Sequence, residues 1–288
     1  MNNIVSYLII IDENINCIFK NLMNLFQKRI IITGATGGLG KALIKELIPY
    51  KVQLGLIDIN ETELKKLSKE LLKQKIKNEI YVCDISKKEQ CKEAVHFFIN
   101  KFNCIDILIN NAGITHRSLF KETNLEVIEK IIHVNLMGSI YCTKFCLEEI
   151  TKNQGTIVII SSISGFAPLY GRTGYAASKH GLSGFFKSLR TELKDFNVNI
   201  LIVYPWFIRT NIDKNALAND GSPAKTQWST IGKIYPPEFV AKKIINGIIK
   251  NKKEIIISAS GKLAYLLNFL FPSLYEDIMK NKIQKEFL

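Results

Sequence analysis

The sequence predicts an α/β fold built on one doubly wound parallel sheet of seven strands. Short apolar runs alternate with longer stretches of helical period, and the alternation continues from residue 28 to 258 without repeat or linker. The composition of the 288 residues is that of an ordinary globular protein, with 47% hydrophobic and 23% charged residues. Strands that are buried on both faces form continuous apolar runs, with crossover helices between them. We therefore expect a single domain over residues 28–258.

The predicted strands share short length, apolar composition and β-branched residues. In chain order they are RIIIT (29–33), VQLGLI (52–57), EIYVC (79–83), IDILIN (105–110), GTIVIIS (155–161), VNILIVY (198–204) and EIIIS (254–258). The predicted helices share apolar residues at three- and four-residue spacing. In chain order they span residues 40–48, 61–74, 88–102, 124–150, 174–195 and 237–251.

Residues 204–235 break this alternation. The segment is rich in Asn, Ser, Thr, Gly and Pro and carries Trp206 and Trp228. Long irregular segments in compact domains often form lids over binding sites. We expect a substrate lid here, and the alternative is a surface insertion.

Apolar segments flank the domain as an N-terminal extension (residues 1–27) and a C-terminal tail (residues 259–288). Both predict amphipathic helices that pack on the domain, mediate oligomers or lie on a membrane, and Pro272 should interrupt the tail helix. We expect the first 22 residues to be dispensable, because Met23 begins a compact lead into the first strand. The sequence has no signal-peptide pattern and no apolar span of membrane length. These features predict a cytoplasmic protein, with peripheral membrane contact through the tail as the alternative.

Charge and cysteine content favour neither a nucleic-acid binder nor a metal site. The formal charge of +13 comes mostly from scattered Lys, and no basic helix carries interleaved aromatic residues. The six cysteines form no CxxC pair and the four histidines are dispersed, so we expect no metal and a reducing compartment. Cys142 and Cys146 are one helical turn apart, and we interpret them as core thiols, with a contact between them as the alternative.

The stretch TGATGGLG, residues 33–40, lies between the first predicted strand and the first predicted helix. Its glycines at 34, 38 and 40 permit a tight turn and a close approach of the backbone to phosphate. The following helix offers free N–H groups and the positive end of its dipole. The position of this loop between strand and helix predicts a pyrophosphate site.

Asp58 ends the second predicted strand, 18 residues after Gly40. A carboxylate there can accept hydrogen bonds from both ribose hydroxyls of an adenosine, and it would repel a 2′-phosphate. We therefore favour NAD(H) as cofactor, with NADP(H) as the alternative. The other interpretation of Asp58 is a simple turn former before Asn60.

The stretch TGYAASKHG, residues 173–181, places Tyr175 and Lys179 four residues apart on one face of a predicted helix. A free tyrosine has a pKa of about 10, which must be lowered for acid/base chemistry near neutrality. The positive charge of Lys179 favours the phenolate. Beside a bound cofactor the pair would be an acid and the group that tunes it, whereas on a solvated surface it would mean little.

These features resemble the classical short-chain dehydrogenase/reductase family over residues 28–258. The resemblance rests on TGATGGLG, CDIS, NNAG, VNLMGS, ISSISG and YAASK, in the family's order and spacing. It implies a Rossmann fold and catalytic roles for Asn135, Ser162, Tyr175 and Lys179. Ser162 is chosen over Ser161 and Ser164 because the family places its serine 13 residues before the tyrosine.

By the same resemblance, a set of residues at the strand ends and in the lid should contact the cofactor. They are Gly34, Thr36, Gly37, Gly38, Leu39, Gly40, Asp58, Asp84, Ile85, Asn111, Ala112, Gly113, Tyr175, Lys179, Pro205, Ile208 and Thr210. The implied activity is reversible hydride transfer between a nicotinamide and a hydroxyl or carbonyl group. The tyrosine would donate a proton, the serine would stabilise the alkoxide, the lysine would bind the nicotinamide ribose and the asparagine would hold a water.

One position departs from the family's pattern, because Trp206 stands where the family usually has a glycine after strand six. We expect its ring to wall the nicotinamide or substrate pocket. The other expected pocket residues are Ile163, Phe166, Tyr170, Phe207 and residues 211–230, and their apolar character predicts a hydrophobic substrate.

Three functional alternatives follow from the sequence. The first is an NAD(H)-dependent dehydrogenase or ketone reductase. The second is a non-catalytic protein that senses the cofactor or scaffolds a partner. The third is an NADPH-dependent reductase of lipid-like ketones at a membrane surface, because residues 208–222 and the apolar tail resemble a subgroup with membrane-associated members. The family resemblance also implies a homodimer or homotetramer formed through the helices at 124–150 and 174–195.

Overall fold

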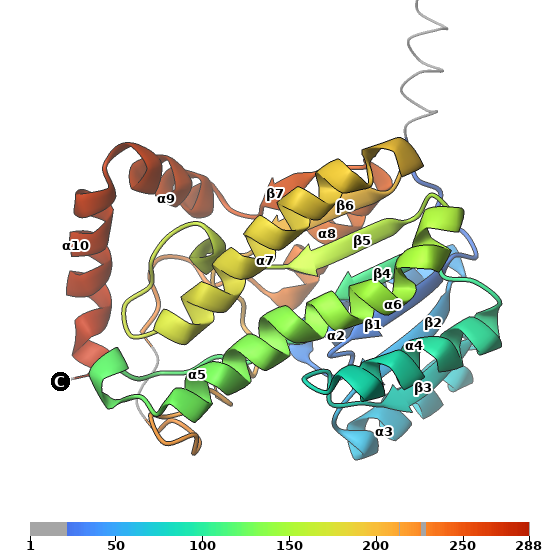
Figure 1. Cartoon of the computed structure of the whole chain (residues 1–288), viewed down its shortest axis with the longest axis horizontal. Coiled ribbons are helices and arrows are strands. Elements are labelled where there is room, and N and C mark those ends of the chain that lie inside the picture. The colour runs from blue at the N-terminus through green and yellow to red at the C-terminus, as the bar shows by residue number, and fades with distance from the viewer. Residues whose placement is uncertain (1–21, 213, 226–228, 288) are drawn as a thin grey trace, which may run out of the picture.

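The structure is a computed structural model that describes residues 22–212, 214–225 and 229–287. All seven strands pair in parallel in one sheet of order β3-β2-β1-β4-β5-β6-β7, which confirms the predicted fold (Figure 1). The strands are β1 (Arg29–Thr33), β2 (Gln53–Asp58), β3 (Asn78–Val82), β4 (Ile107–Asn110), β5 (Thr156–Ile160), β6 (Asn199–Tyr204) and β7 (Glu254–Ile256).

The helices lie where the apolar periodicity predicted them. They are α2 (Gly38–Leu47), α3 (Glu61–Lys73), α4 (Lys88–Phe102), α5 (Leu125–Ile132), α6 (Gly138–Lys152), α7 (Thr173–Glu192), α8 (Pro237–Ile249), α9 (Ala259–Leu270) and α10 (Pro272–Ile283). The helix predicted for residues 124–150 is interrupted by a π-helical turn, His133–Met137, between α5 and α6.

Two apolar cores cover the two faces of the sheet. Ile31 belongs to the core that packs against α4, α6 and α7, whereas Ile30 and Ile32 belong to the core of α2, α3 and α8. Neighbouring strand residues point to opposite faces, so the continuous apolar run of β1 supplies both cores. This explains why the strands of this sequence show no alternation of apolar and polar residues.

Strand β1 lies between β2 and β4, so the chain leaves it in opposite directions in the two halves of the sheet. In doubly wound sheets this switch point opens a crevice at the carboxyl ends of the strands. The loops after β1 and β4, which carry TGATGGLG and NNAG, therefore meet at one edge.

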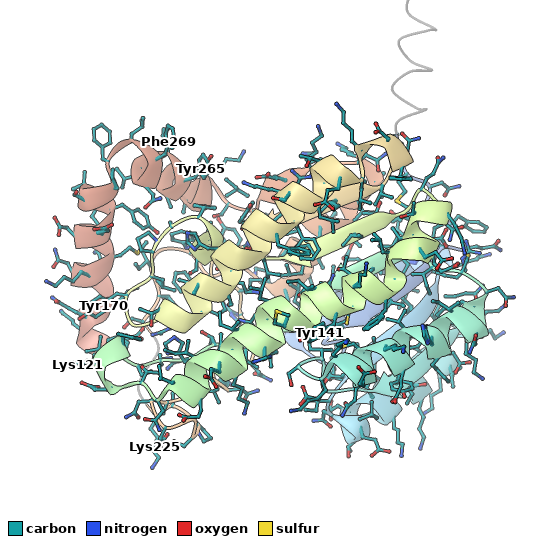
Figure 2. All side chains as sticks on the ribbon, in the orientation of Figure 1. Lys121, Tyr141, Tyr170, Lys225, Tyr265 and Phe269 are labelled. Atoms are coloured by element: carbon teal, nitrogen blue, oxygen red, sulfur yellow. The ribbon has the colours of Figure 1, made fainter. Side chains whose placement is uncertain are left out.

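The C-terminal tail forms α9 and α10, which lie beyond the carboxyl end of β5 (Figure 1). Pro272 begins α10 and separates it from α9, as predicted. Figure 2 shows Phe269 on the outward side of α9, away from the domain. Among the residues that the structure describes, no helix is both long and apolar enough to cross a bilayer.

Most of the predicted N-terminal extension, residues 1–21, lies outside the described residues, as does Trp228. From Met23 onward the chain packs on the domain. The backbone N–H of Met23 donates to the carbonyl of Ile249 at 2.8 Å, and Leu25 is buried.

Candidate active site

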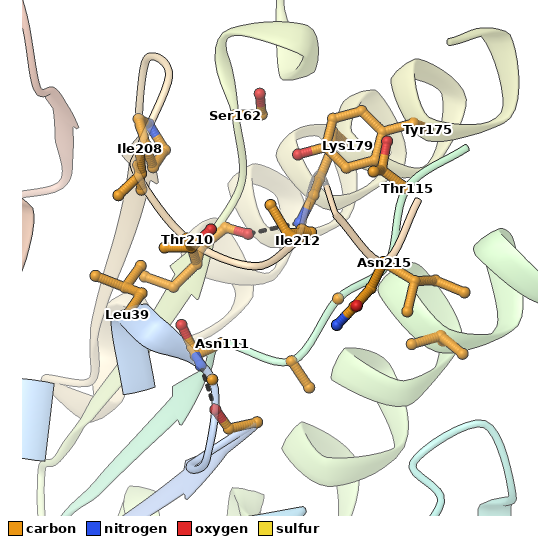
Figure 3. Close-up of a pocket in the computed structure, with 18 of the residues that line it drawn as sticks. Leu39, Asn111, Thr115, Ser162, Tyr175, Lys179, Ile208, Thr210, Ile212 and Asn215 are labelled. Atoms are coloured by element: carbon orange, nitrogen blue, oxygen red, sulfur yellow. Dashed lines mark hydrogen bonds between the residues drawn. The ribbon is translucent and has the colours of Figure 1, made fainter. Parts of the chain in front are cut away.

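A cavity of about 830 Å³ opens at the carboxyl ends of the strands. Its wall includes every predicted catalytic and cofactor residue except Gly40 and Asn135, which are buried behind it. The fold thus brings together residues from the carboxyl ends of strands β1 to β6, the start of α2, helix α7 and the lid segment (residues 204–235). Figure 3 shows a close-up of this site.

The glycine loop requires glycine for close packing. Gly34 has a φ of +65°, and a Cβ there would lie 2.7 Å from the Cα of Ala112. The side-chain amide of Asn111 locks the contact by donating to the carbonyls of Thr33 and Gly34, at 3.0 Å each. No side chain of a described residue caps the N-terminus of α2. Its first N–H groups therefore suit an anion, as the pyrophosphate prediction requires.

Asp58 faces the cavity from the end of β2. Its Oδ2 accepts hydrogen bonds from the backbone N and the Oγ1 of Thr36, at 2.9 and 2.7 Å. Its Oδ1 accepts from the backbone N of Asn60 at 3.1 Å. These contacts fix the carboxylate beside the glycine loop, where a dinucleotide's adenosine ribose would lie. Nearby, Nζ of Lys41 lies 2.8 Å from a carboxylate oxygen of Glu63, so the ammonium of Lys41 is already paired with a carboxylate.

Tyr175 and Lys179 share one face of α7, as the spacing predicted. Nζ of Lys179 lies 5.6 Å from the centroid of the Tyr175 ring and donates to the carbonyl of Ile160 at 2.8 Å. Figure 3 shows the phenol extending from α7 toward the side that carries Ser162, with Lys179 beneath it. Burial lowers the pKa of Lys179 to about 8, because the ammonium has lost most of its hydration.

The two serines at the end of β5 have different surroundings. Ser162 lines the cavity, and its Oγ accepts a hydrogen bond from the backbone N of Ser164 at 3.1 Å. The Oγ of Ser161 donates to the carbonyl of Lys179 at 3.2 Å and lies 3.4 Å from Oγ of Ser183. Ser161 and Ser164 also line the cavity, but the hydroxyl of Ser161 is engaged in tying β5 to α7.

Asn135 lies in the π-helical turn, a distortion that often marks functional sites. Its amide exchanges hydrogen bonds with the backbone N and O of Ile114, at 2.8 and 2.9 Å, and also donates to Oγ of Ser178 at 2.9 Å. A Cβ at Gly113 would lie 3.2 Å from Oδ1 of Asn135 and 3.6 Å from Nζ of Lys179. Gly113 thus allows the loop after β4 to pass between these two residues.

The apolar part of the cavity differs in part from the expectation. Ile163, Trp206 and Phe207 line it, and the indole of Trp206 donates to the carbonyl of Ile231 within the lid segment at 2.7 Å. Phe166 and Tyr170 do not line this cavity. Their rings pack instead on Tyr204 and Tyr265, and on Phe287, respectively.

Sequence reasoning missed the contribution of the tail. Tyr275, Met279 and Ile283 of α10 line the cavity, together with Glu286 beyond the helix end. Their four-residue spacing was the available signal, because it places three apolar side chains on one helix face. The expectation for the tail stopped at packing, oligomerisation or membrane contact.

His116 is a second missed residue. Its Nε2 accepts a hydrogen bond from the backbone N of Gly174 at 3.1 Å, in the first turn of α7, and its Nδ1 lies 3.0 Å from Oγ of Ser118. Burial, with a smaller effect from the Arg172 charge, lowers the pKa of His116 to about 4. The neutral imidazole therefore fixes the N-terminal end of the helix that carries Tyr175.

The described cysteines and histidines form no metal site. No group of three His, Cys, Asp or Glu side chains within the described ranges is arranged to hold a metal ion. Cys142 and Cys146 are buried core thiols, and burial raises the pKa of Cys146. A buried thiol with a raised pKa is a poor nucleophile and a poor metal ligand.

The chain resembles many known proteins along most of its length. The Xenopus tropicalis protein "Dehydrogenase/reductase SDR family member 7B" is 31% identical over 89% of this chain and 86% of its own. The Drosophila melanogaster "Dehydrogenase/reductase SDR family protein 7-like" is 34% identical over 90% of this chain and 81% of its own.

Solved structures share the fold at lower identity. A short-chain dehydrogenase/reductase from Burkholderia phymatum, in complex with NAD, matches with a TM-score of 0.78 and 19% identity, covering 88% of this chain and 96% of that one. An alcohol dehydrogenase from Thermococcus sibiricus, complexed with 5-hydroxy-NADP, matches with a TM-score of 0.68 and 21% identity, covering 80% and 95%. The family model described as "short chain dehydrogenase" matches residues 28–221. The chain therefore belongs to the short-chain dehydrogenase/reductase family of oxidoreductases.

Proposed function

We propose that this protein is an NAD(H)-dependent alcohol dehydrogenase or ketone reductase for a hydrophobic substrate. One observation carries the proposal: Ser162, Tyr175 and Lys179 line the same cavity as the glycine loop. An acid/base, its tuning cation and an oxyanion donor thereby share one space with a dinucleotide cradle.

The glycine loop, Asp58, Asn111 and Thr210 would hold the cofactor, from the pyrophosphate to the nicotinamide. When bound, the nicotinamide supplies or accepts the hydride at its ring carbon. In the direction of reduction, Tyr175 donates a proton to the developing alkoxide. Ser162 donates a hydrogen bond to the same oxygen and stabilises its charge. The positive charge of Lys179 lowers the cost of the phenolate that remains.

Buried Asn135 would support this chemistry indirectly. Its amide holds the backbone of Ile114 and the hydroxyl of Ser178, which belongs to α7 between the tyrosine and the lysine. We propose that Asn135 positions the loop after β4 against α7, and that it holds a water that links Lys179 to solvent.

NAD(H) is the proposed cofactor because the carboxylate of Asp58 is fixed beside the glycine loop, where the adenosine ribose would lie. A 2′-phosphate would face this negative charge at close range. Lys41 lines the same part of the cavity and could offset the repulsion only by leaving Glu63. Substrate apolarity follows from the side chains of Ile163, Trp206 and Phe207, which wall the cavity beyond the catalytic residues.

The experiment that tests the enzyme proposal is the Tyr175→Phe variant. The change removes only the hydroxyl, so the cofactor should still bind while turnover of a ketone panel is lost. Turnover that survives the change would refute the role of Tyr175. A protein that binds cofactor but gives no turnover in either form would favour the non-catalytic scaffold.

A second candidate function is reduction of lipid-like ketones at a membrane surface, with NADPH as the reductant. The observation that favours it is an exposed apolar face on α9, the residue after it and the start of α10: Leu263, Leu266, Phe269, Leu270, Phe271 and Leu274. Contiguous exposed patches of this kind often meet membranes or partners. The protein would then act in the cytoplasm as a peripheral membrane enzyme.

Paired serine substitutions in this face, Phe269→Ser with Leu270→Ser, test the membrane candidate. They should reduce binding to anionic liposomes and leave turnover of a soluble ketone unchanged. Deletion of the whole tail would be a poor test, because α10 also lines the cavity. Absence of liposome binding by the unaltered protein would contradict this candidate.

We also propose a homodimer or homotetramer, formed through the outer faces of α5, α6 and α7. Phe185 on α7 is 40% exposed and would be covered in such an interface. Sedimentation analysis of the protein and of a Phe185→Glu variant tests this: the variant should shift toward monomer.

A further inference from the structure

A buried ion pair joins the end of the chain to the start of the catalytic helix. Nη2 of Arg172 lies 2.7 Å from Oε2 of Glu286, and these side chains are 6% and 0% exposed. Arg172 immediately precedes α7, and its carbonyl accepts the hydrogen bond from the N–H of Ala176. An unpaired buried charge is costly. The ion pair therefore favours the arrangement in which the end of the chain is packed against the start of α7.

The second carboxylate oxygen of Glu286 holds the lid segment. Oε1 accepts a hydrogen bond from the backbone N of Ser229 at 2.5 Å. The ring of the next residue, Phe287, lies 5.8 Å from Cζ of Arg172 and 5.7 Å from the ring of Tyr170. One carboxylate therefore connects three segments that are far apart in the sequence: the lid, the lead into α7 and the end of the chain.

Helix α10 turns one face to the cavity. Tyr275, Met279 and Ile283 are 2 to 5% exposed and line it. Burial raises the pKa of the Tyr275 phenol. The hydroxyl stays protonated and can donate to a ligand. The wall thus offers two apolar side chains and one hydrogen-bond donor.

We propose that the C-terminal segment, residues 272–287, is part of the substrate site, and that Glu286 positions it through Arg172. This inference rests on the proposed function. The substrate class it names is a ketone or secondary alcohol with an apolar chain or ring system that reaches α10. A second polar group at the distal end of such a substrate would meet the hydroxyl of Tyr275.

The test compares Glu286→Gln with Glu276→Gln, the same change at an exposed position of α10 that does not line this cavity. The probes are 2-nonanone and 2-butanone, with the nicotinamide cofactor that binds the protein. In the Glu286 variant, KM for 2-nonanone should rise on the order of tenfold, because the wall that contacts the long chain is no longer held. KM for 2-butanone and the cofactor Kd should stay within roughly twofold, as should all three values in the Glu276 variant.

Equal KM changes for the two ketones, or no change for either, would overturn the proposal. A Met279→Phe variant gives a second test if the Glu286 variant misfolds. Its larger side chain narrows the cavity beside α10 and leaves the ion pair intact. It should raise KM for 2-nonanone selectively, and an unchanged KM for both ketones in this variant would also count against the proposal.

Limited proteolysis separates a failure of this inference from a failure of the proposed function. Trypsin should cleave after the exposed Lys280, Lys282 and Lys285 on the order of tenfold faster in the Glu286 variant than in the Glu276 variant, because undocking exposes the segment. This readout needs neither cofactor nor turnover. Equal cleavage rates would show that the carboxylate does not hold the tail, whatever the protein catalyses.

Discussion

Replacing Lys179 by methionine should change how the stability of the protein depends on pH. Lys179 is buried, and its ammonium donates to the carbonyl of Ile160. Burial lowers its pKa from 10.5 to about 8. Each pKa unit corresponds to about 1.4 kcal/mol, so the folded protein bears a cost of about 3 kcal/mol for the charged form.

The sign follows from proton binding. Between pH 8 and 10.5 the unfolded chain keeps the proton on Lys179 while the folded protein releases it, so the free energy of unfolding rises with pH through this group. Below pH 8 both states are charged and the cost is fully present. The methionine variant lacks this titration, and it should exceed the unaltered protein in stability by the largest margin below pH 8.

Urea unfolding of both proteins between pH 7 and pH 10.5 measures the effect. The stability difference, variant minus unaltered protein, should fall by about 3 kcal/mol over this interval. Ionisable groups that do not contact Lys179 are common to both proteins and cancel in the difference. A difference that stays constant with pH would refute the account of Lys179 as a desolvated ammonium.

Three other changes probe the proposed cofactor site, the loop after β4 and the apolar core. Asp58→Ser should raise affinity for NADPH on the order of tenfold, equivalent to about 1.4 kcal/mol, in fluorescence titrations; unchanged preference would contradict the ribose role of the carboxylate. Gly113→Ala should lower kcat roughly tenfold to a hundredfold, because the added Cβ would contact Asn135 and Lys179. Full activity would show that the space between these two side chains accommodates a methyl group. Phe186→Ala should lower the free energy of unfolding by about 3 to 5 kcal/mol in urea, because the side chain is fully buried between α7 and the sheet; a loss under about 1 kcal/mol would contradict that packing.

The sheet was predictable because its strands are buried on both faces. Ile30, Ile31 and Ile32 are all fully buried, on alternate sides, and such a run is typical of a parallel sheet covered on both faces. The residues of the proposed cofactor site could be named from the sequence because each belongs to a short local motif. Gly34 has its positive φ where the chain leaves β1, Asp58 ends β2 and Asn111 follows β4.

The substrate side was harder to predict because it depends on packing between distant segments. Nothing local to Glu286 indicates that it meets Arg172, 114 residues earlier, or that Ser229 donates to its other oxygen. Phe166 and Tyr170 were expected in the pocket from their nearness to Ser162 in sequence. The ring of Phe166 packs on Tyr204 of β6, and the ring of Tyr170 packs on Phe287 of the tail. These aromatic contacts hold both rings outside the cavity.

The most direct test of the central claim is titration of the purified protein with NADH and NADPH separately, followed by cofactor fluorescence. We expect saturable binding with a clear preference for NADH, since Asp58 would accept hydrogen bonds from the ribose hydroxyls. Preference for NADPH would overturn the Asp58 argument and favour the membrane-surface reductase. Binding of neither cofactor by folded protein would contradict the claim that this cavity is a nicotinamide site.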